Sequence, residues 1–323
     1  MAAQILESLT ASNIFDLRGV VAVVTGGGSN DWKGIGMMIS STLVANGAKV
    51  YIIGPNQSGL DSVCAKYNAE STGVATRGSM HGLEGDIRLK SEATRLASEI
   101  SAREPHGVTI LFNNAGINAA HFTRPTNKPD GSPPTAADFV SACFDEISEG
   151  DFQNVLSTNA VGPYWLTMAF LPLLERWKKS GDEVPAAKKF VPQVVMTSSM
   201  NGWTKDSATS GFSYPYLFSK SAIGHATATL AHEFLPLGIR VNGIAPGLFI
   251  TAINTDPASV DEFGVSDPAK APKSFGFPVP TERGYGTAKD VGSLALFLVA
   301  NWFVNGETVL IDGGTLLKAP SSY

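Results

Sequence analysis

A tyrosine and a lysine in the sequence YLFSK have the spacing of a proton-transfer pair. Tyr216 and Lys220 are four residues apart, so on a helix both side chains project from the same face. A phenol with an unperturbed pKa of about 10 exchanges protons poorly near neutrality unless a nearby cation stabilises its phenolate. Lys220 is the obvious cation. The alternative is a half-buried tyrosine beside a solvent-facing lysine on an amphipathic helix.

A glycine-rich turn is the second candidate for chemistry. The apolar run at 20–26 leads into TGGGSNDWKGIG at 25–36, and apolar residues then recur with helical spacing. Glycine lets the backbone turn tightly and approach a pyrophosphate, while the following helix offers free N–H groups and the positive end of its dipole. Gly26, Gly34 and Gly36 would perform this role, although glycine-rich turns also occur as plain connections.

Short apolar runs alternate with helix-length segments along the chain. The runs are 20–26, 48–54, 108–116, 193–199, 239–247 and 308–314, and the helical segments are 34–46, 58–69, 88–103, 151–174, 213–236 and 287–300. Because crossovers place helices on both faces of such strands, the alternation predicts a Rossmann-like α/β fold with a doubly wound parallel sheet. We expect a single domain over residues 1–323, with a core at about 17–314 and inserted loops.

Two long segments interrupt this alternation. Residues 118–150 contain the turn-rich sequence NKPDGSPPT, and residues 252–286 contain several prolines. An ordinary strand-to-helix connection has only about 2–6 residues. Either insertion is a surface loop or part of the wall over a substrate, and for 252–286 we favour a lid that closes when the ligands bind.

Composition excludes several classes of function. The 43% hydrophobic content indicates a folded globule, and the net charge of -5 comes without a basic cluster that would draw nucleic acid or a membrane. Cys64 and Cys143 lack the spacing of a disulfide framework, and no stretch has the ~20 apolar residues that span a bilayer. We expect a cytoplasmic protein. The five histidines are not at ligand spacing, so no metal site is predicted.

The order of the motifs resembles that of the short-chain dehydrogenase/reductase family over about 17–314. The family's TGxxxGxG turn is similar to residues 25–36. Seven residues separate Gly26 from Gly34 in this chain, where the family has three. Its NNAG turn is present unaltered at 113–116, and NGETVLIDGG at 305–314 resembles its last strand. EGDI at 84–87 and IAPGLFIT at 244–251 also resemble family elements. Five such elements in the family's order make a chance resemblance unexpected.

The resemblance assigns cofactor contacts to these elements. Asp86 in EGDI resembles the family's adenine-contacting aspartate, and IAPGLFIT at 244–251 resembles the turn that holds the nicotinamide carboxamide. In the family the lysine at the place of Lys220 also binds the nicotinamide ribose. The cofactor-binding residues that the resemblance implies are Thr25, Gly26, Gly28, Lys33, Gly34, Ile35, Gly36, Asp86, Ile87, Asn114, Ala115, Gly116, Tyr216, Lys220, Pro246, Gly247, Phe249 and Thr251.

The catalytic set that the resemblance implies is Asn159, Ser199, Tyr216 and Lys220. Ser199 would hydrogen-bond the substrate oxygen and the tyrosine, with Ser198 as the alternative. Asn159 would anchor a water that links the lysine to bulk solvent and so provides a proton route. An amide tied only to its local backbone is the other interpretation of Asn159.

The segment 200–215 is longer than its counterpart in the family. Its aromatic residues Trp203, Phe212 and Tyr214 could line the mouth of the site, which indicates an apolar or ring-bearing substrate. The resemblance further implies a homodimer or homotetramer, because the helices at 151–174 and 213–236 pair across a two-fold axis in the family.

We expect a nicotinamide-dependent oxidoreductase that reduces a carbonyl to an alcohol by hydride transfer, with Tyr216 as general acid. NADPH/NADP+ is favoured over NADH/NAD+, because Gly54 stands where an NAD-selecting acid would stand. Lys33 is available to supply positive charge, although Pro55 replaces the arginine that NADPH users often carry. The alternatives are a non-catalytic dinucleotide-binding sensor or cyclase template, and an enoyl reductase or dehydratase on the same fold.

Overall fold

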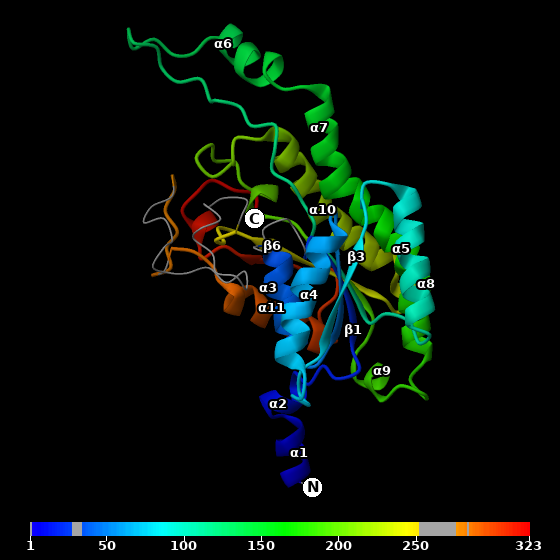
Figure 1. Ribbon diagram of the computed structural model, residues 1–323. Helices are drawn as coiled ribbons and strands as arrows, with labels where there is room; N and C mark the ends of the chain where they lie inside the picture. Colours follow the sequence, from blue (N-terminus) through cyan, green and yellow to red (C-terminus); the bar gives the residue numbers. More distant parts are fainter. Residues whose placement is uncertain (1, 28–33, 252–275, 283) are drawn as a thin grey trace.

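The computed structural model describes residues 2–27, 34–251, 276–282 and 284–323. Its centre is a seven-stranded sheet in the order β3-β2-β1-β4-β5-β6-β7, with every neighbouring pair parallel. The strands are β1 (Val21–Thr25), β2 (Lys49–Gly54), β3 (Ser79–Glu84), β4 (Ile110–Asn113), β5 (Gln193–Thr197), β6 (Arg240–Pro246) and β7 (Thr308–Ile311). The predicted doubly wound, Rossmann-like parallel sheet is confirmed (Figure 1).

Helices cover both faces of this sheet. The α-helices of the described residues are α1 (Ala2–Ser8), α2 (Ala11–Ile14), α3 (Ile35–Ala45), α4 (Gln57–Ser71), α5 (Lys90–Arg103), α6 (Ala136–Val140), α7 (Glu149–Leu156), α8 (Gly162–Lys179), α9 (Pro185–Lys189), α10 (Tyr214–Glu233) and α11 (Ala288–Ala300). Side chains on β1 alternate between two cores: Ala22 and Val24 pack with α3, α4 and α11, whereas Val21 and Val23 pack with α5, α8 and α10. A strand that is apolar on both sides is what a doubly covered parallel sheet requires.

Three elements differ from the sequence-based expectation. Strand β3 was not predicted, because only Met80 and Leu83 are buried in this edge strand and its other residues do not form an apolar run. The predicted helix 151–174 is a longer helical run from α7 through the π-helical turn η2 (Ser157–Val161) to the end of α8. The run 108–116 is a strand only over β4, and its last residues form a turn.

The insertion 118–150 contains α6 and a second π-helical turn, η1 (Ser141–Asp145). Figure 1 shows α6 projecting away from the sheet, and Phe139, Val140 and Phe144 on this projection are exposed. In the insertion 252–286, residues 252–275 and 283 lie outside the described part of the chain. The expectation of a lid therefore falls mostly on residues that the structure does not describe.

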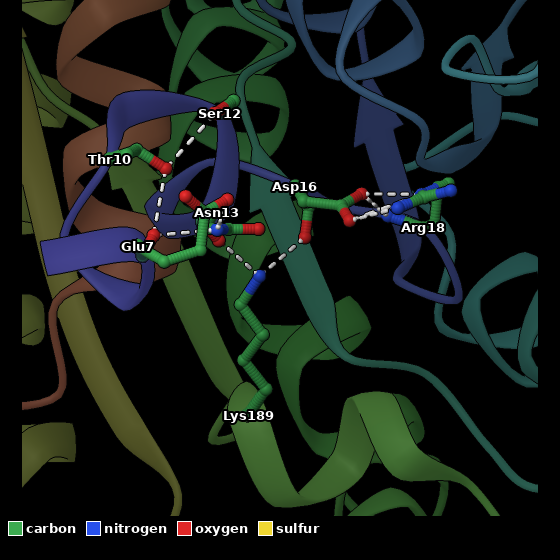
Figure 2. A network of polar contacts seen from close by, with 7 residues as sticks. All are labelled: Glu7, Thr10, Ser12, Asn13, Asp16, Arg18 and Lys189. Carbon is green, nitrogen blue, oxygen red and sulfur yellow. Dashed lines mark hydrogen bonds and ion pairs between the residues drawn. The ribbon is translucent and has the colours of Figure 1, made fainter. Parts of the chain in front are cut away.

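The segment before β1 is fastened to α9 by one lysine, as Figure 2 shows. Helices α1 and α2 bury none of their residues. Lys189 Nζ donates to the backbone oxygens of Asn13 and Asp16, and the Asp16 carboxylate pairs with Arg18 at 2.6 Å. The hydrogen bond from Arg18 holds the pKa of Asp16 below its ordinary value. Within the described ranges, no helix combines the length and apolar character that crossing a membrane demands.

Candidate active site

The ends of β1 and β4 are tied together by a threonine. Thr25 Oγ1 accepts hydrogen bonds from the backbone N–H groups of Asn114 and Ala115 at 3.0 and 2.9 Å. The Asn114 side chain donates back to the Thr25 carbonyl at 3.0 Å. Because the carboxyl ends of parallel strands meet at one edge of the sheet, this joint sits where open α/β sheets bind their ligands.

Two glycines allow the turn after β1 to pack on this joint. Gly26 has φ +71°, and a Cβ there would lie 2.7 Å from Ala115 Cα. A Cβ on Gly36 would lie 2.5 Å from Asn114 Nδ2 and 2.7 Å from the Gly26 oxygen. These glycines are therefore needed for contacts within the protein itself.

Gly34 differs from its neighbours, because a Cβ on it would meet no described atom within 4 Å. It precedes Ile35 at the start of α3 in an extended conformation, with φ -133°, and no described side chain caps it. Among the described residues, no side chain therefore caps the positive end of the α3 dipole, as an anion site at a helix N-terminus requires. Gly28 and Lys33 lie outside the described residues.

Tyr216 lies in the first turn of α10. The backbone N–H of Tyr216 donates to Ser213 Oγ, which caps the helix. Ser199 Oγ, after β5, donates to the Pro246 carbonyl at 3.4 Å, and the Ser199 hydroxyl lowers the pKa of the Tyr216 phenol. Ser198 instead donates to the Lys220 carbonyl at 2.7 Å. The two serines thus have different roles: Ser198 holds the helix backbone, and Ser199 meets the phenol.

Lys220 is buried beside the tyrosine. Its Nζ lies 5.6 Å from the centre of the Tyr216 ring and donates to the Thr197 carbonyl at 2.9 Å. A Cβ on Gly116 would lie 3.3 Å from this ammonium. The NNAG turn and the YxxxK helix therefore meet at Lys220, and glycine at 116 leaves the ammonium uncrowded.

Asn159 connects the segment after the NNAG turn to helix α10, and it lies on a third element, the π-helical turn η2. It lies in η2, where its Oδ1 accepts from Ile117 N at 2.8 Å and its Nδ2 donates to Ile117 O at 2.9 Å. The same Nδ2 donates to Ser219 Oγ at 3.1 Å, and Ser219 donates to the Tyr216 carbonyl at 2.7 Å. The amide is thus bonded to distant parts of the chain and is not tied only to its local backbone.

Burial has the largest effect on the pKa values of Tyr216 and Lys220. This result differs from the expectation. We expected Lys220 to lower the pKa of Tyr216, but burial raises that pKa, and only the hydrogen bond from Ser199 opposes it. Burial lowers the pKa of Lys220 to about 8. Desolvation disfavours the charged form of each group. At neutral pH, Tyr216 therefore carries its proton.

Asp86 follows β3 at the same edge of the sheet. Its carboxylate pairs with Arg88 at 2.6 Å, and that hydrogen bond keeps the pKa of Asp86 below its ordinary value. Arg88 also donates to Asn154 on α7 at 2.8 Å. The neighbouring Ile87 is buried. The pair leaves Asp86 partly exposed, so it remains within reach of a ligand.

The predicted carboxamide-binding residues lie at the end of β6. Pro246 is its last residue, and Gly247 continues the pairing by donating to Ile311 at 2.9 Å. Phe249 is only 2% exposed, and its ring occupies the place where a side chain on residue 286 would stand. Thr251 is buried as well.

Sequence reasoning missed the residues that hold this site together, namely Ile117, Thr197, Ser213 and Ser219. One of them had a local signal. Ser213 precedes Tyr214 and Pro215, and a serine just before a helix with proline in its first turn is typical of an N-cap. The others act through contacts that no local pattern marks. Within the described residues, no group of three or more His, Cys, Asp or Glu side chains could hold a metal.

Comparison with known proteins identifies the family. The family model described as short chain dehydrogenase matches residues 20–260. A short-chain dehydrogenase/reductase of Byssochlamys spectabilis, VdtF, is 34% identical, covering 98% of this chain and 99% of its own. PhomF of Diaporthe leptostromiformis is 32% identical over the whole of both chains. The solved Pseudomonas aeruginosa RhlG/NADP active-site complex is 26% identical, with a TM-score of 0.65 over 94% of this chain and 98% of the other.

The chain belongs to the short-chain dehydrogenase/reductase family of oxidoreductases. Members of this family bind a nicotinamide dinucleotide. The residues present fit such a group: no described side chain caps the helix N-terminus at Gly34, and the glycines at 26, 36 and 116 allow close contacts of the backbone beside it. The family also acts on small-molecule substrates.

The contrast between two glycines gives a prediction. We expect Gly36→Ala to lower the free energy of unfolding by about 1–3 kcal/mol, because its Cβ would press on backbone atoms that cannot move aside. Gly34→Ala should leave unfolding nearly unchanged, because the site is open and the backbone is extended. It should still weaken cofactor binding, since the new methyl group occupies the ligand's space. Urea denaturation and a cofactor titration measure both effects. Equal destabilisation by both variants would contradict this assignment.

Proposed function

We propose that the chain is an NADP(H)-dependent carbonyl reductase that converts a small ketone or aldehyde into an alcohol. The observation that carries the proposal is the arrangement of Ser199, Tyr216 and Lys220, in which a half-buried tyrosine has its pKa lowered by the Ser199 hydroxyl and stands beside a buried lysine. Membership of an oxidoreductase family supports the reaction type.

Thr25, Gly34 and the NNAG turn would hold the pyrophosphate and the adjoining ribose, and Asp86 would meet the adenine. The nicotinamide, when bound, supplies the hydride. Lys220 Nζ, fixed by Thr197, is available to the nicotinamide ribose. Gly28 lies just beyond the described part of the glycine turn. We propose it as a cofactor contact on the resemblance alone.

In the proposed reaction, Ser199 donates a hydrogen bond to the substrate oxygen and polarises the carbonyl. Tyr216 then gives its proton to that oxygen as negative charge develops there. Lys220 keeps a positive charge close to the phenolate that remains, and Asn159 holds the turn and the helix in register around it. Asn159 would also anchor the water through which Tyr216 is reprotonated.

The direction of reaction follows from the protonation of the tyrosine. Burial raises the pKa of Tyr216, so the group carries its proton at neutral pH and is ready to act as an acid. Oxidation of an alcohol needs the phenolate as base, which is scarce at this pH. This difference supports reduction as the favoured direction.

NADPH is proposed over NADH. Strand β2 ends at Gly54, and Pro55 and Asn56 follow, so the sequence places no carboxylate there to repel a 2′-phosphate. The RhlG complex that this chain resembles was solved with NADP. We expect NADPH to bind at least about tenfold more tightly than NADH, which is ~1.4 kcal/mol. Lys33→Ala should weaken NADPH more than NADH. Fluorescence titration measures the four dissociation constants, and tighter binding of NADH would reverse the assignment.

The role of the phenol is tested by Tyr216→Phe, which keeps the ring and removes the proton. Positioned general acid catalysis contributes roughly 10²–10⁴-fold, so kcat for any reducible ketone should fall by that factor while the NADPH dissociation constant stays within about twofold. Tyr164→Phe, on α8 and exposed, is the matched control and should keep kcat. Wild-type turnover by Tyr216→Phe would favour the alternative of a non-catalytic sensor or template.

The pH dependence of kcat/KM for NADPH should follow the protonation of Lys220. Its pKa of about 8 means that the ammonium present at pH 7 is lost as the pH rises further. We expect kcat/KM for NADPH, which reports the free enzyme, to decline above about pH 8. Lys220→Met should lower kcat/KM at every pH and remove this bend. A wild-type profile that stays flat to pH 10 would show that the charge of Lys220 does not serve cofactor binding.

A further inference from the structure

The start of the insertion 118–150 lies beside the end of the insertion 200–215, directly before Tyr216. Ser213 Oγ donates to the Ala119 carbonyl at 2.6 Å, and Phe122 N donates to the Phe212 carbonyl at 2.9 Å. The Phe122 ring stacks on Tyr214 with centroids 4.9 Å apart and planes 1° from parallel. Residues 117–122 and 199–214, called here the insertion joint, are therefore held together by backbone and side-chain contacts.

The backbone of the insertion joint is strained. Ala120 and Phe212 have φ values of 57° and 53°, and they are the residues other than glycine with positive φ in the described ranges. This left-handed conformation is unfavourable for a side chain with a Cβ and persists only where the surroundings impose it. Such residues concentrate at ligand-binding and active sites. The strain therefore indicates that the joint has a binding role.

Two asparagine amides in the joint have no partner for their oxygen. Asn118 Oδ1 and Asn201 Oδ1 are buried and accept no hydrogen bond from any described residue. The amide nitrogens of both lie within 4 Å of the position that a Cβ on Gly211 would take, so the two side chains converge on one place. Buried amide oxygens are nearly always satisfied, which makes two convergent exceptions a marker of a missing ligand group.

Both amides adjoin residues of the proposed chemistry. The Asn201 backbone N–H donates to Ser199 Oγ at 3.2 Å, and the Asn201 side chain is only 8% exposed. Asn118 directly follows Ile117, whose backbone is held by Asn159. Asn201 is thus bonded to Ser199 through its backbone, and Asn118 adjoins the Ile117 backbone that Asn159 holds.

We propose that Asn118 and Asn201 determine substrate specificity by binding a hydroxyl group close to the reacting carbonyl, so that the preferred substrates are α- or β-hydroxy carbonyl compounds. This inference rests on the proposed function. A carboxamide both donates and accepts, as does a hydroxyl, whereas a carboxylate only accepts and an ammonium only donates. The terminal torsion of asparagine is soft, so each amide turns to present its oxygen or nitrogen to the entering group.

The aromatic side chains of the joint complement this polar pair. Phe122 is buried, while Phe212 and Tyr214 are partly exposed around it. They offer an apolar contact to the carbon skeleton of the substrate, and the amides select the position of its hydroxyl. A hydroxylated ring ketone has both features.

The test compares matched ketones, with and without the hydroxyl, under saturating NADPH. Butan-2-one, 3-hydroxybutan-2-one and 4-hydroxybutan-2-one form one set, and cyclohexanone and 2-hydroxycyclohexanone form another. We expect kcat/KM to be at least about tenfold higher for a hydroxylated member than for its parent. Saturation-transfer NMR with the same compounds and the NADP+-loaded protein gives a second readout that needs no turnover.

Asn118→Leu and Asn201→Leu replace each amide by an apolar group of similar shape. We expect each variant to lose about tenfold of the hydroxyl preference, measured as the ratio of kcat/KM for the hydroxylated ketone to kcat/KM for its parent. Their melting temperatures should be equal to or higher than that of the wild type, because an unpaired buried oxygen is removed. Asn68→Leu is the matched control: Asn68 has both amide groups bonded to Met80 at 2.8 Å, so this variant should melt lower and keep the full preference.

The outcomes separate this inference from the proposed function. Turnover of the parent and hydroxylated ketones at equal kcat/KM would overturn the hydroxyl assignment and leave the reductase proposal standing. Absence of turnover with every ketone would contradict the reductase proposal, and the NMR comparison would still decide on hydroxyl binding. Loss of stability in Asn118→Leu and Asn201→Leu without a change in preference would assign the two amides a purely structural role.

Discussion

The carboxamide of Asn159 is bonded at both ends to parts of the chain that are remote in sequence, and the geometry of the site depends on it. Its oxygen and nitrogen grip the Ile117 backbone after the NNAG turn, and the nitrogen also reaches Ser219, one helical turn beyond Tyr216. The extra residue of the π-helical turn η2 alters the direction of the side chains there, a distortion that often occurs at functional sites. Breaking these bonds would leave a buried amide unsatisfied at a cost of about 1–3 kcal/mol, so the three elements stay in register.

Burial around this anchor determines what the titratable groups can do. Lys220 is buried and Tyr216 is half-buried, and desolvation shifts the pKa of each toward its uncharged form. The same enclosure brings Ser199 against the phenol and Thr197 against the ammonium. Desolvation and hydrogen bonding therefore act in opposition at the tyrosine, and desolvation is the larger effect. The result favours a tyrosine that donates a proton.

The parallel sheet supplies the edge on which these groups meet, and the insertions supply the surroundings. Thr25, the NNAG turn, Ser199 and the turn after β6 all follow carboxyl ends of strands, so their convergence is a property of the fold. The insertion joint is a property of this chain. The backbone of the joint is strained at Ala120 and Phe212, and two of its amide oxygens are unsatisfied. This pattern is expected where residues that determine specificity are added to a common scaffold.

The sequence by itself determined the class of fold and the identity of the central groups, because both are written locally. Apolar runs bounded by glycine mark buried parallel strands, and YLFSK places Tyr216 and Lys220 on one helical face whatever surrounds them. Strand β3 escaped prediction because an edge strand is defined by its hydrogen bonds to β2 and not by its own apolarity. Only the tertiary structure decided that Ser199 and not Ser198 meets the phenol, that Gly36 packs internally while Gly34 stays open, and that Tyr216 has a raised pKa. Each of these depends on atoms brought close from distant parts of the chain, and burial and contact between remote residues leave no periodic trace in the sequence.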